Sequence, residues 1–231
     1  MYGWIIPPPR EPTKSSEDFA KERAAKVQEL LRTGYLKSEC IQQALLKVHR
    51  EMFIPRLYKD YAYQEVPLPL PGERATISCP HSYPLFYEPL GLDRGHKFLE
   101  IGTGSGYGAA VAREVVGMEG LVISIEIDPI TFEFARRNLE RAGYNDILLV
   151  NSDGGHGYPE MKPIDRIAIT AACATVPEEL IEQLGPTGRL IAPIQQRQVQ
   201  ELVLYEKATG DLRSSVICDV LYVPLRGVYG S

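Results

Sequence analysis

Apolar residues recur at helical spacing near the start of the chain and predict two amphipathic helices. The first begins after Ser15 or Ser16, either of which can cap it, and ends at Gly34. The second begins at about Ser38 and stops at Pro55. Their apolar stripes are formed by Phe19, Val27, Leu30 and Leu31 in the first helix and by Ile41, Ala44, Leu45 and Val48 in the second.

The residues around these two helices lack such periodicity. Residues 1–16 are rich in proline and charge, and predict an arm that is loosely ordered unless something covers it. The stretch 58–71 is rich in proline and tyrosine, so we expect no regular core element there. Together these patterns predict an N-terminal helical cap with a long loop, rather than an independent domain.

From Lys97 the pattern alternates between short apolar strands and amphipathic helices. Pro129 favours the start of one helix, Gly143 its end, and Gly185-Pro186 stops another. Such alternation is typical of a parallel sheet with helices on both faces. The strands are predicted at 97–101, 121–126, 147–151, 166–170 and 189–194, and the helices at 109–116, 129–142 and 177–184.

The end of the chain differs, because 201–206 and 215–223 alternate apolar and polar residues around the turn Ala208-Thr209-Gly210-Asp211. This pattern predicts an antiparallel hairpin at the edge of the sheet. The expected fold class is therefore α/β, Rossmann-like and doubly wound, with a mostly parallel sheet, an antiparallel edge hairpin and an N-terminal helical cap. The expected boundaries are an arm at 1–16, the cap at 17–96 and the α/β domain at 97–231, with 17–231 forming one structural unit.

Composition narrows the functional classes. The chain has 231 residues and a formal net charge of −5, which weighs against a nucleic-acid ligand because phosphate binding relies on clustered Lys and Arg. The four cysteines form no CxxC pair and the four histidines have no metal-ligand spacing, so we expect no metal. An even cysteine count permits disulfides, but buried thiols in a reducing compartment are the favoured interpretation. Without a signal-peptide pattern or an apolar run near the ~20 residues that span a bilayer, the expected location is cytoplasmic, with no membrane partner.

The strongest local motif is the glycine-rich turn Glu100-Ile101-Gly102-Thr103-Gly104-Ser105-Gly106-Tyr107-Gly108, between a predicted strand and a predicted helix. Its glycines allow the backbone to approach a ligand closely. The subset Gly104-x-Gly106-x-x-Ala109 also fits the dinucleotide fingerprint, so NAD is an alternative ligand. Glu100 distinguishes NAD from the other candidate ligand, S-adenosyl-L-methionine. A carboxylate there can organise the cationic amino-acid end of S-adenosyl-L-methionine and would repel the pyrophosphate of NAD.

Two further acids follow the next two predicted strands. Glu126 lies 20 positions beyond Gly106, where a carboxylate can accept both ribose hydroxyls of either ligand type. Asp153 follows Asn151-Ser152, where it could meet the adenine amino group. Acids at the carboxyl ends of three successive strands fit binding at a topological switch point. The alternative for each acid alone is a solvated charge at a strand end.

Several segments resemble the protein-L-isoaspartate O-methyltransferase family, which belongs to the class I S-adenosylmethionine-dependent methyltransferases. They are Phe98–Tyr107, Ser124–Ile127, Asp165–Ala172 and, most specifically, Ala75-Thr76-Ile77-Ser78-Cys79-Pro80-His81, together with residues near Leu45–Pro55 and Tyr222–Leu225. The resemblance extends from about Val27 to Leu225 and leaves out the N-terminal arm. Ala75 and Cys79 fall at positions where members of the family vary.

The resemblance implies a transferase for protein repair. Such enzymes move a methyl group from S-adenosyl-L-methionine to the α-carboxylate of isoaspartyl residues, and in some members D-aspartyl residues, of damaged proteins and peptides. The ester then closes to a succinimide. A carboxylate with a pKa near ~4 is already ionised at pH 7, so no catalytic base is needed. The implied cofactor-binding residues are Glu100, Gly102, Thr103, Gly104, Ser105, Gly106, Glu126, Ile127, Asp153, Gly154 and Thr170.

The resemblance also assigns roles on the acceptor side. Ser78 would lie at the reaction centre and donate its hydroxyl to a carboxylate oxygen, with Thr76 and Ile77 shaping the same loop. Ser78 is not expected to be a nucleophile, since no His–Asp pattern accompanies it. His81 has either a local hydrogen-bonding role or a substrate contact, and the backbone near Val223 is expected to pair with an extended peptide.

Other interpretations remain open from the sequence alone. The loop 76–81 taken by itself is an ordinary polar turn before a proline. A methyltransferase for another acceptor would keep the cofactor pocket, and a catalytically silent binding protein would keep only the fold. The aromatic residues at 58–63 and the pair Phe86-Tyr87 could stack nucleobases, but without interleaved basic residues packing of the cap is favoured. The oligomeric state is not determined by the sequence.

Overall fold

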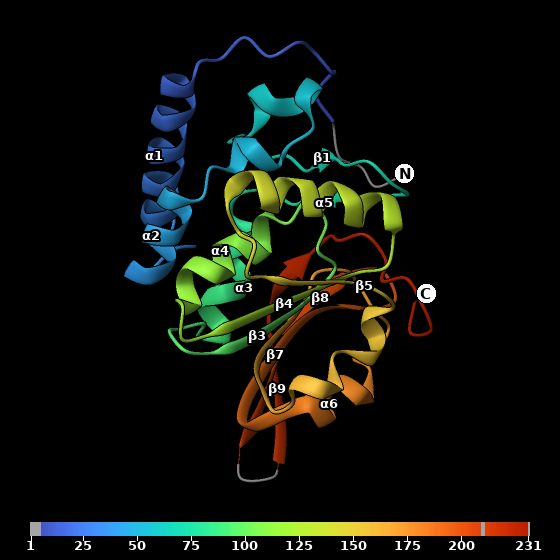
Figure 1. Cartoon of the computed structure of the whole chain (residues 1–231). Coiled ribbons are helices and arrows are strands. Elements are labelled where there is room, and N and C mark those ends of the chain that lie inside the picture. Colours follow the sequence, from blue (N-terminus) through green and yellow to red (C-terminus); the bar gives the residue numbers. More distant parts are fainter. Residues whose placement is uncertain (1–5, 209–210, 231) are drawn as a thin grey trace.

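The computed structural model describes residues 6–208 and 211–230. A seven-stranded sheet runs through its centre in the order β5-β4-β3-β6-β7-β8-β9 (Figure 1). Its first five strands are parallel and the last two pairs are antiparallel. The strands are β3 (Lys97–Ile101), β4 (Leu121–Glu126), β5 (Leu148–Asn151), β6 (Ile164–Ile169), β7 (Leu184–Gln195), β8 (Gln200–Ala208) and β9 (Asp211–Val220).

The order of the strands creates a switch point. The chain moves outward from β3 through β4 to β5, then returns to the other side of β3 with β6 and continues through β7. Ligands bind in such sheets at the carboxyl ends of the strands where the direction of winding reverses. The edge hairpin of β8 and β9 is present as expected, although Thr209-Gly210 of its predicted turn lies outside the described residues.

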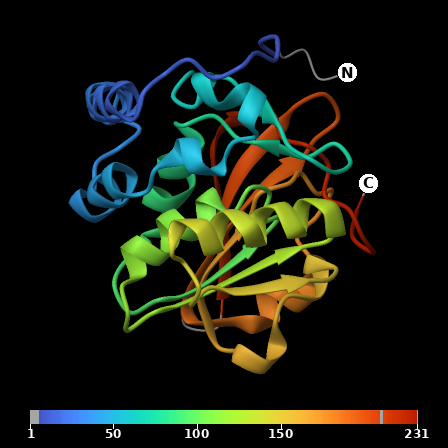
Figure 2. The same cartoon turned by 45° about the horizontal axis from the view of Figure 1, so that its top comes forward.

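Alternating strand residues are buried on opposite faces of the sheet. Phe98 and Val122 face one apolar cluster, while Leu99 and Ile123 face the other. The first cluster is covered by α3, α4 and α5, and the second by α6 (Figures 1 and 2). These helices are α3 (Ser82–Leu90), α4 (Tyr107–Val116), α5 (Pro129–Ala142) and α6 (Glu178–Gln183).

The N-terminal cap packs outside this helical layer. Helix α1 (Ser16–Arg32) contacts α2 (Glu39–Lys47), and α2 lies against α4 (Figure 1). Ser15 caps α1 in a reciprocal capping box with Asp18, which confirms one of the two predicted caps. No helix among residues 6–208 and 211–230 combines the length and apolarity needed to cross a bilayer.

The arm before α1 is held by the cap. The structure describes this arm from Ile6 onwards, and residues 1–5 lie outside the described part. Thr13 donates to the buried carboxylate of Asp60 through both its backbone N–H and its hydroxyl, each at 2.9 Å. Arg10 donates its N–H to the carbonyl of Leu57 at 2.9 Å. We expected the arm to be ordered only if something covers it. The 3-10 helix Arg56–Tyr61 provides that cover.

Two predicted helix boundaries are wrong. Helix α2 ends at Lys47 instead of running to Pro55, because Val48 and His49 are extended and a separate 3-10 helix, Arg50–Phe53, follows. The helix predicted at 177–184 is the six-residue α6, and β7 begins at Leu184. Gly185-Pro186 therefore lies within an irregular strand, whose register with β6 shifts, instead of separating helix from strand.

Several short elements were not predicted, among them helix α3, the 3-10 helices and strands β1 (Leu68–Pro69) and β2 (Thr76–Ile77). Strand β1 lies in the stretch 58–71, where no regular core element was expected. Helix α3 contains two prolines, of which Pro84 falls in the first turn, where a missing N–H costs no hydrogen bond. Strands β1 and β2 form a small antiparallel hairpin below the cap. The aromatic pair of α3 packs as favoured, with Phe86 against Tyr222 and Tyr87 against Phe98.

Candidate active site

A cavity of about 810 Å³ opens at the carboxyl ends of β3, β4 and β6. One part of its wall is the turn after β3 together with the end of β4. Another part is formed by β2 with the residues that follow it, and by the segment 218–227. This volume is in the range of small-molecule sites, roughly 300–1,000 Å³, and its position is the switch point of the sheet.

The structure brings nearly all of the predicted site residues together in this cavity. Gly106 and Asp153 are the two that do not line it. The lining residues from the cofactor set are Glu100, Gly102, Thr103, Gly104, Ser105, Glu126, Ile127, Gly154 and Thr170, and those from the acceptor set are Thr76, Ile77, Ser78, His81 and Val223. Residues of both predicted sets therefore line one space.

The glycine turn is shaped by close packing behind it. Gly102 has a left-handed φ of 97°, and a Cβ at this position would collide with the hydroxyl of Thr170. Gly106 has a φ of 85° and begins α4, where it packs against Leu139 instead of facing the cavity. At Gly108 a Cβ would overlap the carboxylate of Glu100, so glycine is required there by space and not by φ.

Glu100 is a buried carboxyl at the floor of the cavity. It is 3% exposed, and the hydroxyl of Ser124 donates to it at 2.6 Å. Burial raises its pKa to about 8; the Ser124 hydrogen bond opposes this rise and the charge of Glu126 adds to it. Glu100 therefore carries a proton for much of the time at neutral pH, and a cation placed beside it would favour its charged form.

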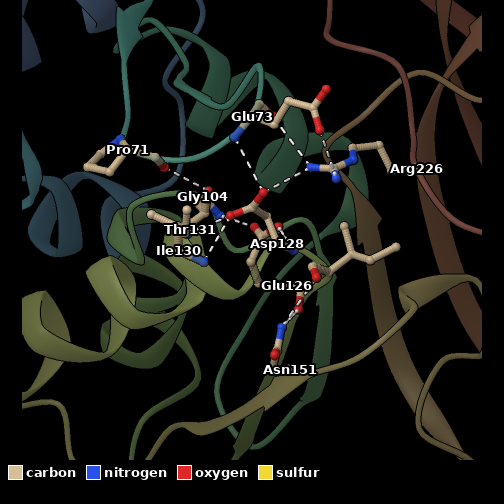
Figure 3. A network of polar contacts seen from close by, with 10 residues as sticks. Pro71, Glu73, Gly104, Glu126, Asp128, Ile130, Thr131, Asn151 and Arg226 are labelled. Carbon is tan, nitrogen blue, oxygen red and sulfur yellow. Dashed lines mark hydrogen bonds and ion pairs between the residues drawn. The ribbon is translucent and has the colours of Figure 1, made fainter.

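Glu126 closes β4 and is held by backbone donors. The N–H of Gly104 donates to it at 3.0 Å and the N–H of Asp128 at 3.1 Å (Figure 3). Burial raises its pKa, while these two N–H groups act in the opposite direction. The side-chain amide of Asn151 donates to the Glu126 carbonyl at 2.7 Å, which ties the end of β4 to the end of β5.

Asp128 was missed by the sequence analysis and lies at the rim of the cavity. It caps α5 by accepting from the N–H groups of Ile130 and Thr131, each at 2.9 Å. Burial alone would raise its pKa, but the Thr131 hydrogen bond, Arg226 and other donors outweigh it and lower the pKa to about 2. The Asp128-Pro129 pair is a helix-start signature that could have revealed this cap.

Asp128 also joins two distant segments that line the cavity, and Figure 3 shows these contacts. It accepts from the N–H of Glu73 at 3.3 Å and pairs with Arg226 at 3.2 Å. Arg226 reaches the Glu73 carboxylate as well, at 3.4 Å, and Thr131 donates its hydroxyl to the carbonyl of Pro71 at 2.8 Å. The loop between β1 and β2 and the C-terminal segment are thus fastened to the start of α5.

Asp153 faces the C-terminal segment instead of the cavity. Its carboxylate accepts from the N–H of Gly155 at 2.9 Å and from that of Val228 at 2.7 Å. Tyr229 continues the same segment and donates to Glu179 at 2.9 Å. An adenine contact by Asp153 remains a prediction.

His81 is engaged locally. Its Nδ1 lies 2.6 Å from Glu65, which also pairs with Lys26 at 3.1 Å. This favours the local hydrogen-bonding role over the other alternative, although the ring still borders the cavity. The ligating atoms of Glu65, Cys79 and His81 lie within 4.8 Å of one another. Because the Lys26 ammonium already neutralises Glu65, we interpret the cluster as an ion-pair network.

Val223 uses its carbonyl inside the protein. The N–H of Ala172 donates to that carbonyl at 2.8 Å, and Leu225 donates back to Ala172 at 2.7 Å. Within the described residues, the Val223 N–H has no acceptor. The expected pairing with an extended peptide therefore has one backbone donor to use at this position.

Comparison with known proteins identifies the family. The model of the protein-L-isoaspartate(D-aspartate) O-methyltransferase family matches residues 21–229. The chain belongs to this family. It is thus a protein-L-isoaspartate O-methyltransferase, and the glycine turn and the loop after β2 both lie within the matched range.

Curated relatives and solved structures of similar proteins agree with this assignment of the methyltransferase. The protein-L-isoaspartate O-methyltransferase of Hyperthermus butylicus is 44% identical over 227 residues, covering 94% of each chain. That of Methanothermobacter thermautotrophicus is 42% identical, covering 90% of this chain and 97% of its own.

A solved protein-L-isoaspartate O-methyltransferase superimposes with a TM-score of 0.83 at 36% identity, over 90% of this chain and 67% of that one. A putative family enzyme from Plasmodium falciparum, solved with S-adenosyl-L-homocysteine, has a TM-score of 0.80 at 23% identity, which supports the fold. It covers 88% of this chain and 98% of the other.

Proposed function

We propose that S-adenosyl-L-methionine binds along the glycine turn and that the isoaspartyl α-carboxylate is held opposite it, on the Ser78 side of the same cavity. One observation carries this proposal: the acid-and-glycine residues and the Thr76–His81 loop border one space of about 810 Å³. A donor and an acceptor bound at these two parts of its wall would meet inside it.

The residues of the first part fit the cofactor. Its ammonium suits Glu100, which is buried and gains its negative charge most readily beside a cation. Its ribose hydroxyls suit Glu126, whose carboxylate is oriented by two backbone N–H groups. Gly154 lies on the side where the adenine would extend. When bound, this cofactor supplies a methyl group on a positively charged sulfur.

The protein's task in the transfer is alignment. The acceptor oxygen forms a bond to the methyl carbon while the carbon–sulfur bond breaks, and the electron pair of that bond returns to sulfur. The products are a neutral methyl ester and a neutral thioether, and no proton moves. Ser78 would orient the carboxylate through its hydroxyl. Alignment of two reactants can contribute roughly 7–11 kcal/mol, which suits a site without a catalytic base.

We propose as substrates damaged proteins and peptides that contain isoaspartyl residues, whose esters close to a succinimide and start repair. The family description also includes D-aspartate, so we extend the proposal to D-aspartyl acceptors. We place the protein in the cytoplasm, supported by its four cysteines, which are all unpaired thiols, as is usual in a reducing compartment.

The experiment compares two forms of one peptide, synthesised with isoaspartate or with normal aspartate. Methyl transfer from labelled S-adenosyl-L-methionine is followed as base-labile methyl ester. We expect transfer to the isoaspartyl form alone, and a turnover at least tenfold lower in Ser78→Ala with unchanged affinity for S-adenosyl-L-homocysteine. Ser214→Ala, on the exposed face of β9, is the matched control.

Equal transfer to both peptides, or to neither, would contradict the proposed substrate. Full turnover by Ser78→Ala would instead remove Ser78 from the reaction centre and leave the substrate class standing.

A further inference from the structure

Arg50 is a fully buried cation directly behind the acceptor loop. It begins the 3-10 helix Arg50–Phe53 and is 1% exposed. Its Nε donates to the carbonyl of Ala62 at 2.6 Å, and one Nη donates to the carbonyl of Ser78 at 2.6 Å. Its other Nη has no hydrogen-bond partner among the described residues. A guanidinium is thus buried with part of its bonding capacity unused.

No described carboxylate forms an ion pair with Arg50. Its neighbour in sequence, Glu51, forms an ion pair with Arg23 at 3.4 Å and accepts a hydrogen bond from the hydroxyl of Tyr63 at 2.6 Å. The acids of the cavity have partners elsewhere, since Glu100 accepts from Ser124 and Glu126 accepts from backbone N–H groups. An isolated buried charge is costly, so a counter-charge near this position would be strongly favoured.

Aromatic rings compensate for only part of this cost. The guanidinium carbon lies 5.1 Å from the centre of the Tyr107 ring and 5.6 Å from that of Tyr83. Such contacts are attractive, but each is weaker than a full opposite charge at hydrogen-bond distance. The arrangement therefore keeps Arg50 in place without neutralising it.

The positive charge reaches the wall of the cavity. Cys79 and Tyr83 both line that wall, and Ser78 presents its own carbonyl to Arg50. Burial raises the pKa of Cys79 to about 11 and that of Tyr83 to about 12, and in both cases the charge of Arg50 opposes the rise. In a low-dielectric setting such an influence extends over several ångströms.

We propose that Arg50 is the positioning residue of the acceptor: it fixes the Ser78 loop and acts as the buried counter-charge of the substrate's α-carboxylate. This inference rests on the proposed function. The carboxylate supplies the negative charge that the protein itself does not place there. Arg50 acts through the loop and the local potential, without touching the reacting atoms.

This role has a kinetic consequence. The acceptor loses its charge as the ester forms, so Arg50 attracts the substrate more than the transition state or the product. Removing such an interaction raises KM and does not by itself lower kcat, so any loss of kcat would come from the loosened Ser78 loop. In the native enzyme the preference for the charged acid over neutral molecules favours release of the ester, and removal of Arg50 weakens that preference.

The test measures the affinity of the full-length protein, saturated with S-adenosyl-L-homocysteine, for two peptides. One contains isoaspartate and the other isoasparagine, which replaces the α-carboxylate by a neutral amide of similar shape. We expect the native enzyme to prefer the acid at least tenfold. Arg50→Met should lose most of this preference, and Arg50→Lys, which keeps the charge, should retain it with a lower kcat.

Arg23→Met is the matched control, because it removes a buried arginine of the same cap that does not contact Ser78. We expect it to leave the acid-to-amide ratio unchanged. The ratio of the affinities for the two peptides does not depend on the fraction of folded protein. Binding of S-adenosyl-L-homocysteine shows separately whether each variant folds. If Arg50→Met does not fold, loss of the preference in a folded Arg50→Lys would overturn the inference.

Other outcomes separate the two proposals. Equal weakening of acid and amide binding in Arg50→Met would mean that Arg50 only supports the loop, and would overturn the inference. A native enzyme that methylates the isoaspartyl peptide but binds acid and amide equally would also overturn it. Failure of the native enzyme to methylate the peptide would refute the proposed function itself.

Discussion

Glu100 is the residue whose protonation should couple cofactor binding to pH. Its pKa in the free protein is raised to about 8 by burial, and a bound ammonium would favour the carboxylate and lower that pKa. Binding should therefore release protons below pH 8, and affinity should rise as the pH increases from about 6 towards 8, by at most about tenfold per pH unit.

Calorimetry with S-adenosyl-L-homocysteine in buffers of different ionisation enthalpy measures this proton release directly. Glu100→Gln is the matched control, since it keeps the shape and can still accept from Ser124. We expect its affinity to lack the rise with pH that the native enzyme shows. Identical pH dependence in both proteins would show that Glu100 does not meet the ammonium.

The same carboxyl affects stability with a defined sign. Because its folded pKa lies above the unfolded value near 4.5, Glu100 binds its proton more tightly in the folded state. Its contribution is thus most favourable below that value and is lost as the pH rises towards about 8. Glu100→Gln should gain stability relative to the native protein between pH 5 and pH 9, as measured by urea unfolding.

At the residue scale, the sequence located those site residues whose chemistry is tied to a strand end or a motif. Glu100 and Glu126 were found because a strand ends in an acid beside a glycine turn. Arg50, Asp128 and Arg226 were missed. Arg50 lies between His49 and Glu51, where a charged residue does not stand out, and its partners Ala62 and Ser78 are set by tertiary packing.

At the element scale, the C-terminal segment and the loop between β1 and β2 are held over the cavity by Arg226, which bridges Asp128 and Glu73. Arg226 itself is 41% exposed, and ion pairs of such exposed side chains contribute little, about 0–1 kcal/mol each. Arg226→Met should therefore speed release of S-adenosyl-L-homocysteine by only about threefold to tenfold. Stopped-flow displacement measures this rate.

The control for this substitution is Arg197→Met, an exposed arginine in the turn between β7 and β8. We expect native release from this variant. If Arg226→Met also released the ligand at the native rate, the Arg226 ion pairs shown in Figure 3 would have no part in retaining it.

Elements with a complete local signature were predicted to the residue. β3 and β4 are short apolar runs, and α5 has Asp128-Pro129 before it and Gly143 after it. The errors fall where packing overrides local preference. After α2 a 3-10 helix begins at the buried Arg50, whose hydrogen bonds go to distant carbonyls, and in β7 the neighbouring strand β6 extends pairing to Leu184.

At the scale of the whole molecule, the N-terminal arm joins the cap through Asp60, which is 1% exposed. Burial alone would raise its pKa, but donors from Thr13 and Lys14 and the charge of Arg10 outweigh burial and lower it. Deleting residues 1–14 would leave this carboxylate without those donors. We expect a loss of about 1–3 kcal/mol in the free energy of unfolding.

Because the folded pKa of Asp60 is depressed, this loss should be present above pH 4 and shrink as the pH falls below it. Glu11→Ala is the control, since its ion pair with Arg56 is exposed. We also propose that 17–231 is one structural unit, so the shortened protein should unfold in one transition, with circular dichroism and ligand binding lost together. Two separate transitions would contradict this.

The topology brings the cavity's walls together from segments far apart in sequence, with the loop after β2 facing the turn after β3 and the end of β4. A crystal structure with S-adenosyl-L-homocysteine and an isoaspartyl peptide would test this arrangement most directly. We predict sulfur above the glycine turn and an α-carboxylate oxygen beside Ser78, separated by the space of one methyl group. A carboxylate bound away from Ser78, or a cofactor outside the wall of Glu100 and Glu126, would contradict it.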